Sequence, residues 1–176
     1  MFLKSRFAPL YVAVLIFVLD FLSKFFTRSF IPLMDFSSPF FPYGGIGIFR
    51  DFLGIEFSIS YRTNTGAAWG VFADYPEYLT VFRICMVLLI VVYLFFFNKD
   101  CSWNWPFSLV ISGACGNILD FFLYGHVVDM FHFKFWGYDY PVFNIADSAI
   151  SIGVFWLMLL TFWDKRETNP EGIDGS

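Results

Sequence analysis

The chain has 176 residues, of which 58% are hydrophobic, 24% are aromatic and only 15% are charged. This balance excludes an ordinary water-soluble domain, in which roughly a quarter of the residues are charged, and it indicates an integral membrane protein. The formal net charge of −4 is small and spread along the chain, so no nucleic-acid partner is expected.

The first apolar segment follows two basic residues, Lys4 and Arg6, an order that is also typical of a secretory signal peptide. This segment is too long for a signal peptide, and no small-residue cleavage site follows it. We therefore expect it to be the first of four transmembrane helices, because a helical span needs about 20 apolar residues. The expected spans lie near 9–26, 78–97, 105–122 and 142–163.

The segment between the first two spans begins with many turn-forming residues and then alternates between apolar and polar side chains from Ile55 to Tyr61. Alternation of this kind predicts a β-strand with one buried face. The side chains expected on that face are Ile55, Phe57, Ile59 and Tyr61. A small sheet near 46–70 would set the segment 64–70 beside the ends of the helices.

The chain is therefore expected to be an all-α membrane protein with four transmembrane helices and a small extracytoplasmic β-sheet. It would form a single four-helix domain, 1–165, followed by a polar cytoplasmic tail, 166–176, that we expect to be disordered. Basic residues concentrate at the cytoplasmic ends of spans, and here they predict that both termini are cytoplasmic. These residues are Lys4, Arg6, Lys99, Lys165 and Arg166.

Ionisable side chains inside apolar spans are costly, so their depth in the membrane is informative. Chain direction places the charged and amide side chains of all four spans near the outer ends of the helices. They are Asp20, Lys24, Arg83, Asn117, Asp120, Asn144 and Asp147. Residues three or four apart share a helix face, so Asp20 can pair with Lys24. Gly113 and Gly116 leave room for close approach of another helix.

Several of these side chains also have a structural interpretation. The pair of Asp20 and Lys24 is better explained as an ion pair that orients the helix than as part of a catalytic site. Asn117 and Asp120 fit equally well as hydrogen-bonding groups between helices and as support for a site. Arg83 would pair with an acid or extend to the membrane surface, and we assign no chemistry to it.

Asp129 is harder to explain by structure alone, because it follows the apolar Val127 and Val128, where an unpaired carboxylate is costly. Its expected partner is Asp147. Asp147 also has a structural interpretation, because a negative charge is favourable near the start of a helix and Asn144 would cap that helix. Two close carboxylates share one proton. The ionised member can take a proton from water while the other polarises a peptide carbonyl, which is the chemistry of an aspartic protease.

No other catalytic arrangement competes with this pair. The sequence has two histidines, His126 and His132. It contains neither the Gly-x-Ser-x-Gly motif of serine hydrolases nor the His-Glu-x-x-His motif of zinc peptidases. We therefore expect no metal site, no cofactor and no disulfide. The three cysteines have no paired spacing, and Cys85 and Cys115, which lie within spans, are interpreted as small buried hydrophobic residues.

Five short motifs follow one another along the chain. They are Asp20 to Lys24, Asn64-Thr-Gly-Ala-Ala-Trp-Gly70, Gly116-Asn-Ile-Leu-Asp120, Val127-Val-Asp129 and Phe143-Asn-Ile-Ala-Asp-Ser148. In this order the chain resembles the lipoprotein signal peptidase family, also called signal peptidase II. The resemblance implies an aspartic endopeptidase of the bacterial cytoplasmic (inner) membrane. Such an enzyme removes the signal peptide from diacylglyceryl-modified prolipoproteins, cleaves just before the lipidated Cys, and uses no metal.

The resemblance also implies the residues of the site and its partners. Asp129 and Asp147 would be the catalytic pair, at the outer face of the membrane and below a mobile outer loop. The substrate-binding or site-supporting residues would be Asn64, Gly66, Asn117, Asp120, Asn144, Ala146, Asp20 and Lys24. The implied partners are lipidated prolipoproteins, membrane lipids and the cyclic peptide inhibitor globomycin.

The chain departs from the family pattern in two places. Phe121 stands where the family usually has Arg, so the contacts of that Arg would have to be made by Arg62 or Arg83. The outer segment 34–51 is also longer and more aromatic than is usual in the family.

Two other classes of function remain open at this stage. Intramembrane acids also serve as relays in transporters, but a relay needs polar groups on both sides of the membrane midplane. The inner halves of these spans offer few polar groups beyond Ser108 and Ser112, which favours the peptidase. A purely structural membrane subunit would use the same polar cluster as packing between helices.

Overall fold

The computed structural model describes residues 7–38, 40–66 and 74–167, with the backbone alone for 164–167. Within these residues, four helices are long and apolar enough to cross a membrane. They are α1 (Ala8–Phe30), α2 (Pro76–Phe96), α3 (Asn104–Tyr124) and α4 (Ile145–Glu167), with a short 3-10 helix, η3 (Cys101–Trp103), before α3. The expected fold class of four such helices with a small sheet is confirmed.

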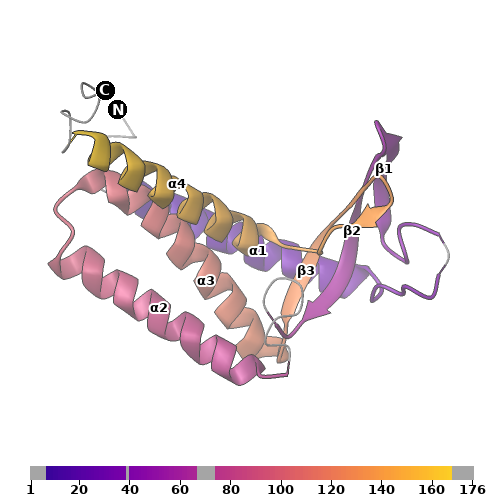
Figure 1. Ribbon diagram of the computed structural model, residues 1–176. Helices are drawn as coiled ribbons and strands as arrows, with labels where there is room; N and C mark the ends of the chain where they lie inside the picture. The colour runs from indigo at the N-terminus through magenta and orange to yellow at the C-terminus, as the bar shows by residue number, and fades with distance from the viewer. Residues whose placement is uncertain (1–6, 39, 67–73, 168–176) are drawn as a thin grey trace, which may run out of the picture.

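The helix α3 is central and packs against α1, α2 and α4 (Figure 1). Two glycines of α3 allow the neighbouring helices to approach it closely. A β-carbon at Gly113 would collide with the backbone carbonyl of Ala146, and a β-carbon at Gly116 would collide with the carboxylate of Asp20. The close contact that these glycines predicted is therefore present, and it brings α1 and α4 against the same stretch of α3.

The bundle has an apolar exterior and a polar interior near one end. Large apolar side chains are exposed along the helices, for example Leu15, Phe95 and Phe155. The largest fully buried side chains instead include Lys24 and Asn117. An exterior of this kind suits lipid, and polar groups that are buried within such a bundle mark the place where a site is to be sought.

A four-stranded antiparallel sheet lies across the end of the bundle opposite to the one where α1 begins and α4 ends (Figure 1). Its strands, in order across the sheet, are β1 (Ile46–Phe52), β2 (Ile55–Asn64), β3 (Val127–Phe135) and β4 (Tyr138–Asp139). In the pairing of β2 with β3, Arg62 stands opposite Asp129. Because β3 begins shortly after α3 ends, the sheet holds Asp129 close to the ends of the helices.

The predicted buried face of β2 is wrong. The face that carries the apolar side chains is only partly buried, whereas the two serines between them, Ser58 and Ser60, are completely buried. The segment before β1 covers the serine face, since a β-carbon at Gly45 would collide with the Ser60 hydroxyl. His132 of β3 stands opposite Ser58 and is also completely buried, with its ring 5.6 Å from that of Phe41.

The rule for the buried face failed because another part of the chain covers the opposite face of the strand. The rule assumes that the apolar face packs on the protein while the other face meets water, but here the segment before β1 packs on the serine face and the apolar face stays partly open. On this open face Phe57 and Phe133 stack with ring centroids 4.4 Å apart, and Phe133 also stacks on Phe143 at 6.0 Å.

Cys85 is exposed on α2 and not buried as predicted, because the outward face of an apolar helix that can cross a membrane need not be covered by protein. Cys115 on α3 is partly buried. The helix α4 continues to Glu167, so the predicted disordered tail begins as helix, and its remainder, 168–176, lies outside the described residues. Residues 67–70 of the predicted outer segment also lie outside them, as do Lys4 and Arg6.

Candidate active site

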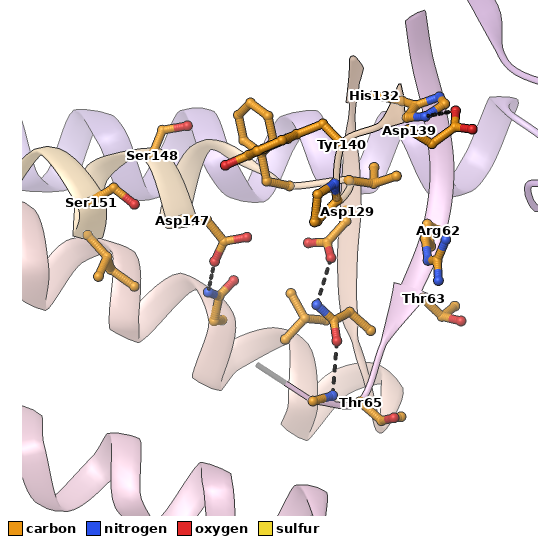
Figure 2. Close-up of a pocket in the computed structure, with 18 of the residues that line it drawn as sticks. Arg62, Thr63, Thr65, Asp129, His132, Asp139, Tyr140, Asp147, Ser148 and Ser151 are labelled. Atoms are coloured by element: carbon orange, nitrogen blue, oxygen red, sulfur yellow. Dashed lines mark hydrogen bonds and ion pairs between the residues drawn. The ribbon is translucent and has the colours of Figure 1, made fainter. Parts of the chain in front are cut away.

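A pocket of about 830 Å³ lies where the helices meet the sheet. Its walls come from β2, β3 and the start of α4, with contributions from α2 and α3 (Figure 2). Polar side chains that line it include Asn64, Arg83, Asn117, Asp129 and Asp147. In Figure 2 the carboxylates of Asp129 and Asp147 point into the same space from opposite walls.

Asp129 is held on β3 by two side-chain amides. Its side chain is almost completely buried, with 1% of the residue exposed. The Nδ2 group of Asn64 donates a hydrogen bond to Asp129 Oδ2 at 2.9 Å, and the Nδ2 group of Asn144 donates one to Oδ1 at 2.7 Å. Both carboxylate oxygens are therefore fixed in orientation toward the pocket.

Asp147 is held in the first turn of α4. The Nδ2 group of Asn117 donates a hydrogen bond to Asp147 Oδ1 at 2.8 Å. Asn144 caps this helix, because its Oδ1 accepts the backbone N–H of Asp147 at 2.8 Å. The capping interpretation of Asn144 is thus correct, and the same side chain also contacts Asp129. A single asparagine links the two aspartates.

The pocket changes the acidity of Asp129. Burial, together with the negative charge of Asp147, raises the pKa of Asp129 from its ordinary value of 3.8 to about 8. The amide hydrogen bonds from Asn64 and Asn144 and the charge of Lys24 act in the opposite direction and are outweighed. A carboxyl group with this pKa carries a proton at neutral pH, which is the condition for one shared proton in a pair of carboxylates.

A buried ion-pair network lies behind the two aspartates. The Lys24 ammonium is 2.7 Å from Asp20 Oδ2 and 3.0 Å from Asp120 Oδ2, and it donates a hydrogen bond to Asn117 Oδ1 at 2.9 Å. The predicted pair of Asp20 and Lys24 is therefore present, with Asp120 as a second partner. The three charged side chains are each about 1% exposed.

This network also holds the backbone next to each aspartate. Asp20 Oδ1 accepts the N–H of Ala146, the residue before Asp147, at 2.8 Å. Asp120 Oδ2 accepts the N–H of Val128, the residue before Asp129, at 3.0 Å. One lysine therefore ties together the two carboxylates that position the neighbours of Asp147 and Asp129.

All ten predicted site residues fall in this one region, but not all of them face the pocket. Gly66 lies beside Asn64, and its N–H donates to Asn64 Oδ1 at 2.9 Å. Ala146 is completely buried against α3. The predicted residues that stand behind the pocket walls are Asp20, Lys24, Asp120, Asn144 and Ala146. Their position suits support of the site better than contact with a ligand.

Sequence reasoning missed two residues at the pocket, His132 and Asp139. It assigned no chemistry to Arg83, which was expected to pair with an acid or extend to the membrane surface, and Arg83 lines the pocket. His132 and Asp139 lie at the far end of the pocket from Asp147 (Figure 2), with His132 Nε2 3.0 Å from Asp139 Oδ1. Burial lowers the pKa of His132. No motif marks these side chains, and their proximity depends on how β3 and β4 pair.

The structure shows what surrounds Phe121, which stands where the family usually has Arg, and where the two possible substitutes for that Arg lie. Phe121 packs beside Phe122, with ring centroids 6.3 Å apart. Of the two arginines considered as substitutes, Arg62 is exposed and stacks over the ring of Phe36 at 5.1 Å. Arg83 is less exposed and is attracted electrostatically by both Asp147 and Asp129.

The fold and the pocket define a class of protein: an integral membrane protein with four apolar helices and a polar site, containing two facing carboxylates, at one end of the bundle. Comparison with known proteins gives the family. A sequence profile of the signal peptidase (SPase) II family matches residues 12–163. The chain belongs to the signal peptidase II family, and it is therefore a protease and a multi-pass protein of the bacterial inner membrane.

Individual relatives agree with this assignment. The lipoprotein signal peptidases of Staphylococcus aureus strains JH9 and Newman are each 34% identical to this chain over 120 residues, covering 66% of this chain and 72% of theirs. A bacterial membrane enzyme solved by the in meso method at 2.3 Å resolution is 26% identical, with a TM-score of 0.74 over 96% of this chain and 94% of that chain. Another, solved at 1.9 Å, is 26% identical, with a TM-score of 0.69 over 87% and 91%.

Proposed function

We propose that this protein is an intramembrane aspartyl endopeptidase that removes signal peptides from diacylglyceryl-modified prolipoproteins, with Asp129 and Asp147 as its catalytic pair. The observation that carries the proposal is the arrangement of these carboxylates on opposite walls of one pocket, each oriented by an asparagine. The raised pKa of Asp129 supports a pair that holds one proton.

The reaction follows from that protonation state. The ionised aspartate takes a proton from a water molecule, and the water oxygen attacks the scissile carbonyl carbon. The protonated aspartate hydrogen-bonds to the carbonyl oxygen and stabilises the negative charge that develops there. Collapse of the tetrahedral intermediate breaks the C–N bond, and the leaving amine takes a proton from the pair. Water activation of this kind needs no metal ion.

The substrate is expected to arrive within the membrane plane. The pocket is lined on the α4 side by Ile150 and Ile152 as well as by Ser148 and Ser151, so its wall is apolar as well as polar. Ile152 is also exposed on the outside of the bundle, where lipid is expected. A lipidated chain could therefore place its acyl chains against the helix surface and its peptide bond between the two aspartates.

We also propose the orientation predicted from the basic residues, with both termini in the cytoplasm and the sheet outside. The positions of the helix ends support this proposal, because α1 begins and α4 ends at the end of the bundle away from the sheet (Figure 1). Cleavage before the lipidated Cys would then occur at the outer face. Globomycin, as a cyclic peptide, would occupy the same pocket.

The substrate class can be tested with the purified protein. A diacylglyceryl-modified prolipoprotein peptide and the same peptide without lipid would be incubated with the enzyme in detergent micelles, and products identified by mass spectrometry. We expect cleavage only of the lipidated peptide, directly before its modified Cys, and inhibition by globomycin. Cleavage at another bond, or equal cleavage of the unlipidated peptide, would contradict the proposed substrate class.

A further inference from the structure

Arg83 lies on the face of α2 that is turned toward the rest of the bundle. Between Leu79 and Ile90 of this helix, the less exposed residues recur every three or four positions, as expected for one face of a helix. They are Leu79, Thr80, Arg83, Ile84, Val87 and Ile90. A charge on this face is directed into the protein, and Arg83 accordingly lines the pocket.

A chain of hydrogen bonds leads from Arg83 to Asp129. The guanidinium group donates to the carbonyl oxygen of Gly66 at 3.4 Å, and the N–H of Gly66 donates to Asn64 Oδ1 at 2.9 Å. The other end of the Asn64 amide donates to Asp129 Oδ2 at 2.9 Å. Because Gly66 engages the oxygen of the Asn64 amide, the NH₂ group of that amide must face Asp129.

Arg83 is also well placed to act through its charge. Lys24, the buried cation behind the pocket, is engaged by two carboxylates, Asp20 and Asp120. Arg83 contacts no carboxylate directly among the described residues, and it is attracted by Asp147 and Asp129 together. The other ionisable groups around the pair are Asp20, Lys24, Arg62, Asp120, His132 and Asp139.

We propose that Arg83 is a positioning residue for the catalytic pair, which holds Gly66, and through it Asn64 and Asp129, while its positive charge stabilises the negative charge of the pair. This inference rests on the proposed function, because it assumes that Asp129 and Asp147 are the reacting carboxylates. A nearby cation stabilises the negative charge of a carboxylate. Without Arg83, both steps of ionisation of the pair would occur at higher pH.

The test compares Arg83→Gln with Arg83→Lys in cleavage assays across a range of pH. Arg83→Gln should lower kcat by about 10- to 100-fold, as expected when a catalytic group loses its alignment, with little change in KM. It should also move both limbs of the pH profile upward by about one pH unit. Arg83→Lys should return the profile to its normal position but recover kcat only in part, because an ammonium group lacks the fork of the guanidinium. Arg50→Gln, an exposed change on β1, is the matched control.

Two results would overturn the proposal. An unshifted pH profile in Arg83→Gln would remove the electrostatic role, and a loss of kcat that Arg83→Lys does not relieve would indicate simple packing. Thermal unfolding of each variant establishes that equal amounts of folded protein are compared.

A readout without substrate separates this inference from the proposed function. The protonated carboxyl groups of the wild type and of Arg83→Gln would be titrated by infrared spectroscopy, with Asp129→Asn to assign the Asp129 band. We expect the midpoint of that band to rise in Arg83→Gln. An unchanged midpoint would overturn the role of Arg83 even if the wild type cleaved no lipoprotein. Normal cleavage with an unchanged midpoint would overturn this inference alone.

Discussion

Replacement of Lys24 by Met tests whether one buried cation holds the site together. Lys24 lies 2.7 Å from Asp20 and 3.0 Å from Asp120, with all three side chains nearly inaccessible to solvent. Methionine retains most of the volume but removes the charge, so both carboxylates would be buried without a counter-ion. Loss of one partner of a buried ion pair costs about 3–5 kcal/mol. Because this cation serves two carboxylates, we expect a loss near the upper end of that range.

The assay is denaturant unfolding of the purified protein in detergent, with Lys99→Met as a control at an exposed position. The double variant Lys24→Met, Asp120→Asn should recover part of the loss, because asparagine can still accept the N–H of Val128 without carrying a charge. If Lys24→Met had the same free energy of unfolding as the wild type, or if Asp120→Asn lowered it further, the argument from unpaired buried charge would be refuted.

Three other predictions concern Asp129 and the glycine contact. Asn64→Ala removes the 2.9 Å hydrogen bond to Asp129, so kcat should fall by about 10- to 100-fold, and the alkaline limb of the pH profile should move upward because this hydrogen bond lowers the pKa of Asp129. In Gly116→Ala the new methyl group collides with the carboxylate of Asp20, which should lower the free energy of unfolding by about 1–3 kcal/mol. An unchanged midpoint of denaturant unfolding would mean that α1 and α3 can move apart without loss of stability. Asp129 keeps its proton to about pH 8 in the folded protein, against an ordinary pKa of 3.8, so the free energy of unfolding should fall as the pH rises between these values. In Asp129→Asn the free energy of unfolding should depend less on pH. If the dependence were as steep in this variant as in the wild type, it would have to come from other groups.

Much of the site could be predicted because depth in the membrane is encoded by position along each span. Asp20, Asn117 and Asp147 lie on three different helices, and the alternating chain direction alone places them at one end of the bundle. The pairing of Asp129 with Asp147 needed more, since Asp129 lies on a strand whose path no periodicity reveals. The apolar neighbours of Asp129 indicated that it needs a partner, the family resemblance implied the same pair, and the pocket brings the two carboxylates to the same space.

The bonds that align the site could not be predicted. Asp20 accepts the N–H of Ala146 and Asp120 accepts that of Val128, contacts that depend on helix rotation and on the exact start of β3. Arg83 was expected at the outer end of α2, but its direction toward the pocket was not predicted, because nearly every residue of α2 is apolar and the face that turns inward cannot be recognised from the sequence. The buried serine face of β2 was missed because the segment that covers it, before β1, has no periodicity from which its path could be predicted.

The central claim is that Asp129 and Asp147 together activate the water that cleaves the lipoprotein. The most direct measurement is the rate of cleavage of a diacylglyceryl prolipoprotein peptide by Asp129→Asn and Asp147→Asn at equal concentrations of folded protein. Asp51→Asn serves as the control, because Asp51 is exposed on β1 and its φ of 52° is one that asparagine tolerates. We expect product from the wild type and the control and essentially none from either variant at the pair. Cleavage at the wild-type rate by Asp129→Asn or Asp147→Asn would contradict the claim for that residue and with it the shared-proton mechanism.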